Sequence, residues 1–106
     1  MLIYFAVDGG IANQMRSIAI ASDGAAAVQV NGRSTTTQLP ADTVQGLTRQ
    51  LTESGLFDRN RSYPAQGADL QRYEIRFRGA TVVWFDTSTP AALQAPTAAL
   101  ERALRS

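Results

Sequence analysis

The sequence predicts an α+β domain, an antiparallel sheet with helices packed on one face, in the element order ββββαββα. Three observations support this prediction. Four short strand-like segments follow one another before residue 40, a segment with helical spacing follows at 40–54, and two more alternating segments precede a final helical one. A chain of 106 residues has room for one hydrophobic core, so we expect residues 1–106 to form a single domain.

The first two strands are predicted from the alternation of apolar residues. Residues 2–7 are apolar on both faces, which favours a strand that is either central or covered on both sides. A second run near 16–21 also alternates. Ile3, Phe5 and Val7 share one face of the first strand, and Ile18 and Ile20 share one face of the second.

Two further strands are predicted before residue 40. Residues 26–30 alternate, and "RSTTTQ" at 33–38 carries β-branched threonines that favour a strand. Asn31-Gly32 between them is typical of a type I′ hairpin turn. The polarity of the fourth strand suits the edge of a sheet.

The segment 40–54 has the spacing of an amphipathic helix. Its apolar face is formed by Val44, Leu47 and Leu51. Gly55 is the expected helix stop, and the two residues after it, Leu and Phe, are expected to pack beneath the helix.

The second half of the chain predicts a hairpin and a final helix. Residues 58–67 have loop composition, and Tyr73, Ile75 and Phe77 alternate in the strand that follows. Residues 80–86 are the hairpin partner of that strand. Thr89-Pro90 opens a short helical segment, after which Pro96 either starts the final helix or kinks one continuous helix.

Composition excludes several kinds of chemistry. The chain has no cysteine and no histidine, which excludes thiolate zinc sites and removes the usual acid–base group at neutral pH. All ten basic residues are arginine, so lysine Schiff-base chemistry is excluded as well. We therefore expect no enzyme activity, no cofactor and no bound metal.

Charge and hydropathy bear on partners and location. A net charge of +1 gives no electrostatic reason to expect binding to nucleic acid or to an anionic membrane. No apolar run approaches the roughly 18 residues of a membrane span, and the N-terminus lacks the pattern of a signal peptide. We expect a cytoplasmic protein that is monomeric when free.

Two groups of polar residues are further candidate sites. The carboxylates of Asp58, Asp69, Glu74 and Asp86 would need to meet in space to act together, and solvated surface acids are the more frequent case. "RYEIRFR" at 72–78 contains residue types that bind single-stranded nucleic acid. Its alternation favours a core role for the aromatic residues and a solvated face for the arginines and Glu74.

Trp84 and the first loop are the remaining candidates. Trp84 is expected to be half-exposed and to cover the sheet, rather than to be a binding hot spot. Asp8-Gly9-Gly10 ends the first strand, and Ile11 follows in a stretch where loop residues are usually polar. Ile11 is at an odd position and the apolar residues of the second strand are at even ones. Either a bulge shifts the register, or residues 8–15 project as a true loop.

The ordered pattern of motifs resembles the emfourin family, small protein inhibitors of thermolysin-like (protealysin-type) zinc metallopeptidases. The matching stretches are "IYFAVDGGIA", "LTRQLTESGLFD" and "YPAQGADLQRYEIRFRGATVVWFD", followed by a final helix after a proline. Family members commonly carry serine and an aromatic residue around the glycines, where this chain has Asp8 and Ile11. Arginines often follow that segment in the family, and in this chain only Arg16 is near. These departures imply either a different target protease or a loss of inhibition.

The resemblance implies a reversible, non-enzymatic inhibitor that blocks the active-site cleft of such a peptidase. The implied protease-binding residues are Asp8, Gly9, Gly10, Ile11, Ala12 and Asn13. Ile11 would fill the pocket for the bulky apolar residue after the cleavage point, and the glycines would let the backbone enter a narrow cleft. Which of Ile11 and Asp8 approaches the peptidase zinc is left open. The alternative is an interaction domain of the same fold with a different partner.

Overall fold

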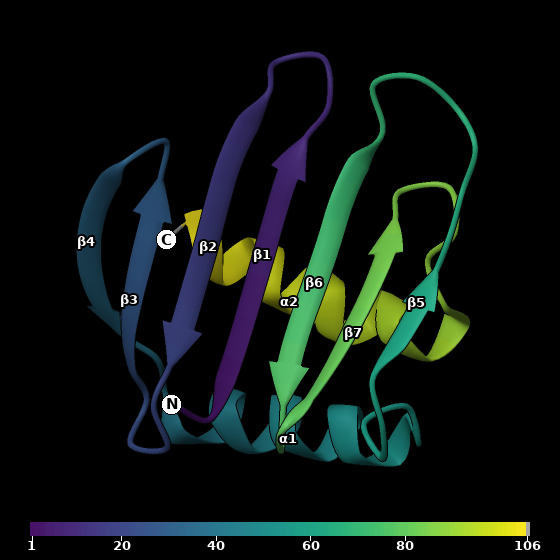
Figure 1. Ribbon diagram of the computed structural model, residues 1–106. Helices are drawn as coiled ribbons and strands as arrows, with labels where there is room; N and C mark the ends of the chain where they lie inside the picture. The colour runs from purple at the N-terminus through teal and green to yellow at the C-terminus, as the bar shows by residue number, and fades with distance from the viewer. Residues whose placement is uncertain (106) are drawn as a thin grey trace.

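The computed structural model describes residues 1–105 and confirms the α+β class. A seven-stranded sheet has the strand order β4-β3-β2-β1-β6-β7-β5, and all neighbours pair antiparallel except β5 and β7 (Figure 1). The strands are β1 (Ile3–Gly9), β2 (Gln14–Ile20), β3 (Ala25–Val30), β4 (Arg33–Gln38), β5 (Arg61–Tyr63), β6 (Gln71–Phe77) and β7 (Ala80–Phe85).

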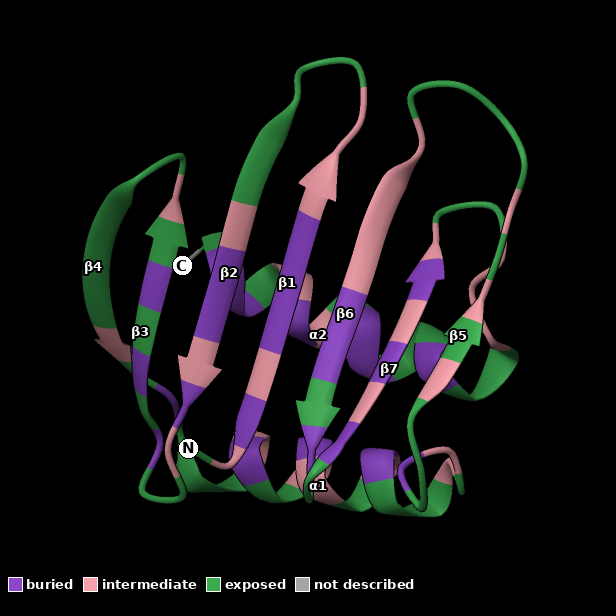
Figure 2. Cartoon of the chain, in the orientation of Figure 1, coloured by how far each residue is buried: buried purple, intermediate pink, exposed green. Residues whose placement is uncertain are grey.

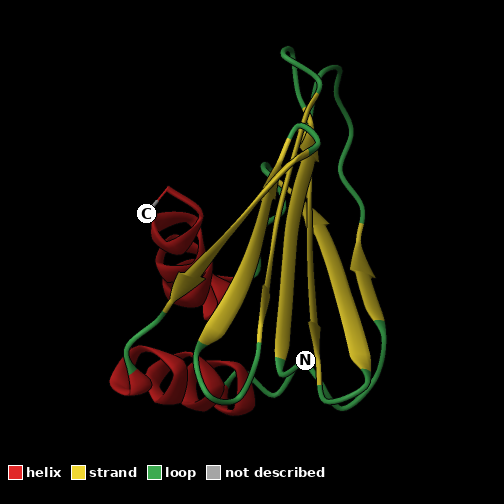
Figure 3. Ribbon diagram, turned by 90° about the vertical axis from the view of Figure 1, so that its left-hand side faces the viewer, coloured by secondary structure: helices red, strands yellow, loops and turns green. Residues whose placement is uncertain are grey.

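Both helices lie on the same side of the sheet. Helix α1 (Ala41–Glu53) closes the lower end of the core, and the 3₁₀ turn η1 (Ala91–Leu93) leads into α2 (Gln94–Arg105), which crosses the face (Figures 1 and 3). Within residues 1–105, no helix lies on the opposite face of the sheet (Figure 3). The predicted stop at Gly55 is confirmed, since its φ is +69°.

The core lies between the sheet and the helices. Ile18, Phe5, Ile75 and Val82 are cross-strand neighbours in one row across four strands, and all four are fully buried. The predicted inner face of α1 is confirmed, because Val44, Leu47 and Leu51 are buried. Burial fades toward the upper ends of β1, β2 and β6 (Figure 2). The loops at that end therefore project beyond the core.

Two predicted elements need correction. The stretch 58–67 was expected to be loop, but residues 61–63 form β5, a short edge strand parallel to β7. The final helix begins at Gln94 rather than at Pro96. Pro96 lies in its first turn, where the missing N–H removes no intrahelical hydrogen bond.

The open face of the sheet is partly covered by its own long side chains. Glu74 was expected on a solvated face, but its side chain is only 8% exposed. Arg72 Nη1 donates to Glu74 Oε1 at 3.0 Å, and Arg76 Nε donates to the other carboxylate oxygen. The Arg76 guanidinium also lies 4.9 Å from the centre of the Tyr4 ring. Glu74 tolerates burial at this position because each of its carboxylate oxygens keeps a charged hydrogen-bond partner.

Trp84 is fully buried, which corrects the expectation of a half-exposed ring. Its ring stacks on Tyr73 with 5.5 Å between centroids, on the side of the sheet that faces the helices. The indole Nε1 has no hydrogen-bond acceptor among the described residues. Trp84 therefore belongs to the core and offers no exposed surface for binding a partner.

Tyr73 should make stability depend on pH in alkaline solution. Burial is the largest cause that raises the pKa of the Tyr73 hydroxyl above 10.0, and the charges of Glu101 and Asp86 add to it. Because the folded pKa is raised, its contribution to stability is complete below the unfolded pKa and is lost as pH rises through the folded pKa. Urea unfolding midpoints should therefore begin to fall as the pH rises past about 10, the ordinary tyrosine pKa, and should go on falling while the raised folded pKa is passed. The same fall in Tyr73→Phe would assign it to another group.

Candidate functional site

The candidate site is the connection between β1 and β2. The two strands pair without a bulge from Ile3–Ile20 to Gly9–Gln14, which leaves a loop of residues 10–13. This loop is called the tip loop below. Neither sequence-based alternative is correct, because the register is regular and the loop is shorter than 8–15. An even number of loop residues pairs odd positions of β1 with even positions of β2, so no bulge is needed to keep both apolar sets inside.

The tip loop is a β-turn that presents Ile11. Asn13 N–H donates to the Gly10 carbonyl at 3.1 Å, which places Ile11 and Ala12 at the two central positions of the turn. Asn13 closes the turn with a φ of +49°, a conformation that asparagine tolerates better than most residues. The Ile11 side chain is 90% exposed, although isoleucine is among the residues most often buried in proteins.

Gly9 and Gly10 are needed by the geometry of this connection. Their φ values are +87° and +78°, in the left-handed region that favours glycine. A Cβ on Gly9 would lie 3.0 Å from the Leu70 carbonyl oxygen, and one on Gly10 would lie 3.0 Å from Cγ of Gln71. Both glycines therefore allow a close approach to the start of β6.

The six residues predicted from the sequence are only partly brought together. Gly10, Ile11, Ala12 and Asn13 form the tip loop, whereas Asp8 and Gly9 belong to β1. Asp8 is half-buried and lies opposite Met15 on one side and Arg72 on the other. Its carboxylate is therefore set back from the exposed isoleucine, among the side chains of the open face.

A neighbouring loop at this site was not predicted. Residues 64–70, called the β5–β6 loop below, end beside the tip loop, and Gly10 N–H donates to the Leu70 carbonyl at 3.3 Å. The start of β6 is also tied to the end of β7, since Asp86 N–H donates to the Gln71 carbonyl at 3.2 Å. In the sequence this region is marked only by a proline and a glycine. These residues indicate a loop, but they do not predict which other segment the loop contacts.

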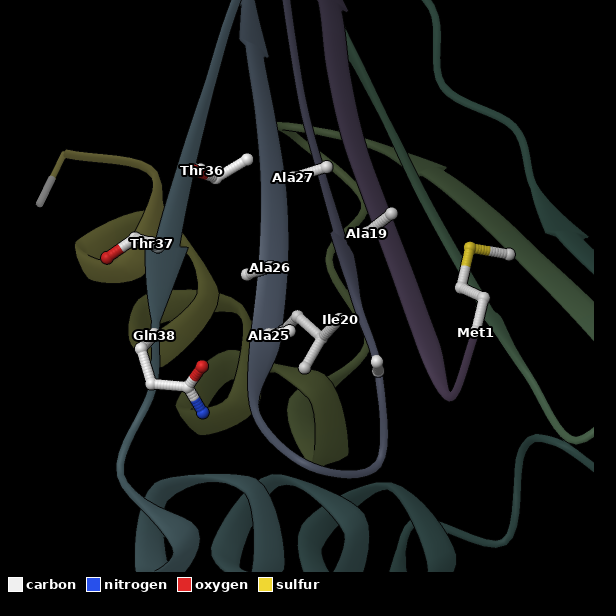
Figure 4. A pocket seen from close by; sticks show the side chains of 10 residues that line it. Met1, Ala19, Ile20, Ala25, Ala26, Ala27, Thr36, Thr37 and Gln38 are labelled. Atoms are coloured by element: carbon white, nitrogen blue, oxygen red, sulfur yellow. The ribbon is translucent and has the colours of Figure 1, made fainter.

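A second concave region lies at the opposite end of the sheet. It is a hollow of about 730 Å³ over β2, β3 and β4, lined mainly by alanine and threonine (Figure 4). Ala19, Ala27 and Thr36 form one cross-strand row in it. Its lining has no charged side chain, so no acidic or basic side chain stands there to activate the threonine hydroxyls.

The other candidate residues form no combined site. Asp58 pairs with Arg61 at 2.9 Å, and the hydrogen bond from Arg61 lowers the pKa of the Asp58 carboxyl. Residues 1–105 contain no group of three or more acidic, histidine or cysteine side chains that could share a metal ion. Tyr73 and Phe77 face the helices, as predicted, and are unable to stack on bases from the open face.

No protein-family model matches the chain, and no curated protein matches it with significant similarity. In the part of the chain that the structure describes, no helix is long and apolar enough to cross a membrane.

Proposed function

We propose that this protein is a reversible inhibitor of thermolysin-like zinc metallopeptidases, which blocks the active-site cleft with the segment 8–13. The observation that carries the proposal is the exposed Ile11 side chain at a central position of a β-turn. The class of target comes from the resemblance of the chain to the emfourin family. Peptidases of this class prefer a bulky apolar residue just after the cleavage point, and Ile11 is a side chain of that kind.

The scaffold supports this proposal because the tip loop is held at both ends. It joins β1 and β2, and β1 also pairs with β6 along its whole length. A short turn between paired strands loses little conformational freedom when it binds, which is the general advantage of a preorganised inhibitor. In the proposed complex the zinc and the catalytic groups belong to the peptidase, and this chain supplies shape and an apolar side chain.

Titration of thermolysin with the purified protein tests the proposal. We expect hydrolysis of a small peptide substrate to fall as the protein is added and to recover on dilution, with the inhibitor intact by mass spectrometry. Ile11→Asp is the matched variant that should not inhibit, because it would bring an unpaired charge into an apolar pocket. Full peptidase activity with excess wild-type protein would reject thermolysin as a target and favour an interaction domain with a different partner. Cleavage between Gly10 and Ile11 without inhibition would mean that the protein is a substrate.

A further inference from the structure

The tip loop is too small to form a stable protein interface by itself. Specific interfaces bury about 800 Å² on each partner and use roughly 20–30 residues a side. The segment 8–13 has only six residues, and Asp8 and Gly9 are already engaged in the sheet. A partner that binds there must therefore also contact other exposed segments at the same end of the molecule.

The β5–β6 loop is the segment closest to the tip loop. β1 and β6 are antiparallel neighbours, with Gly9 opposite Gln71, so the end of one strand lies beside the start of the other. The hydrogen bond from Gly10 N–H to the Leu70 carbonyl joins the two loops directly. The glycine at position 9 lets them approach without a gap, since any Cβ there would meet the Leu70 carbonyl.

These two loops also reach farther from the core than the other connections at this end. In Figure 1 the tip loop and the β5–β6 loop extend above the β3–β4 turn and the connection that follows β7, and Figure 3 shows the same from the side. A partner surface that touches Ile11 would therefore meet the β5–β6 loop before any other part of the chain.

The composition of the β5–β6 loop suits close contact with another protein. Pro64, Gln66, Gly67, Ala68 and Asp69 are exposed, and none of them is bulky and apolar. Asp69 has a φ of +58°, so the loop leaves ordinary extended geometry just before it joins β6. Its small side chains leave the backbone accessible, and no cation lies within residues 64–70.

We infer that residues 64–69 form a second contact with the same peptidase, against the wall of the cleft that the tip loop enters. This inference rests on the proposed function and adds the surface that the tip loop lacks. The Leu70 carbonyl has a different role, because it holds the Gly10 amide and so fixes the direction in which the tip loop leaves the sheet. The two loops together act as one rigid surface with an apolar side chain at one edge.

Arginine substitutions on the β5–β6 loop test the second contact. Gln66→Arg and Ala68→Arg each place a long charged side chain where the peptidase wall should lie. Each should raise the inhibition constant for thermolysin on the order of tenfold or more, since a buried unpaired charge and a steric clash both oppose binding. Ala27→Arg on β3 is the matched control, because Ala27 is exposed on the open face away from the loops, and its inhibition constant should stay within about twofold of wild type.

The outcomes separate this inference from the proposed function. If wild type inhibits, Ile11→Asp does not, and both loop arginine variants inhibit like wild type, the second contact is wrong and the inhibitor proposal stands. If the wild-type protein does not inhibit thermolysin, the inhibitor proposal and the second contact are both rejected. Melting temperatures of the four variants should match wild type, and amide exchange at Gly10 should be unchanged in Gln66→Arg. Faster exchange of the Gly10 amide in Gln66→Arg, together with normal inhibition by Ala68→Arg, would mean that Gln66→Arg weakens inhibition by disturbing the tip loop. That result would overturn the second contact.

Discussion

Replacing Ile11 with alanine should weaken inhibition of thermolysin on the order of ten- to a hundredfold while leaving the fold intact. Burial of an isoleucine side chain in an apolar pocket contributes roughly 1.5–3 kcal/mol, and alanine keeps little of that area. Because the side chain is 90% exposed in the free protein, its loss removes almost no packing. The melting temperature should therefore stay within about two degrees of wild type.

The measurement is an inhibition constant determined beside a thermal melt. Thr36→Ala is the matched control, since it truncates another exposed β-branched side chain on the edge strand β4, far from the tip loop. Ile11→Asp should be weaker than Ile11→Ala, because the aspartate must lose its hydration on entering the pocket. Equal inhibition by wild type and Ile11→Ala would show that this side chain does not fill a pocket.

Leu51→Ala should lower the free energy of unfolding by roughly 2–5 kcal/mol, a range measured for buried leucines. Leu51 is 0% exposed on the inner face of α1, where it contacts the main hydrophobic core. Its truncation removes apolar area from the core and leaves a cavity that the surrounding strands can fill only in part. Urea unfolding followed by circular dichroism gives the value.

Gln45→Ala is the control for this experiment, since Gln45 is exposed on the same helix and its replacement should change stability by no more than about 0.5 kcal/mol. Helix α1 lies at the end of the sheet opposite the tip loop (Figure 1). Folded Leu51→Ala should therefore inhibit as well as wild type. A stability change near zero would mean that α1 does not pack as described, and lost inhibition in the folded variant would mean that the interface reaches α1.

The site was predicted from the sequence only where local signals exist. Gly9-Gly10 followed by Ile11 marked an unusual loop, and the structure places Ile11 at its exposed centre. The predicted length of the loop was wrong, because the length depends on which residues of β1 and β2 pair. The β5–β6 loop was missed as a neighbour, because its contact with Gly10 joins residues about sixty positions apart.

The sequence by itself determined the elements whose signals repeat over a few residues. Alternation in the strands, the apolar face of α1 and the Asn31-Gly32 turn all follow from local backbone geometry and side-chain direction. Local signals of this kind also predicted that Tyr73 and Phe77 face inward.

Only the tertiary structure decided the features that depend on pairing between distant segments. β5 is a strand because β7 offers it a free edge. The adjacency of the two loops follows from the pairing of β1 with β6. In each case the stabilising partner lies across a strand or across the sheet, and the energy of that contact exists only once the chain has folded.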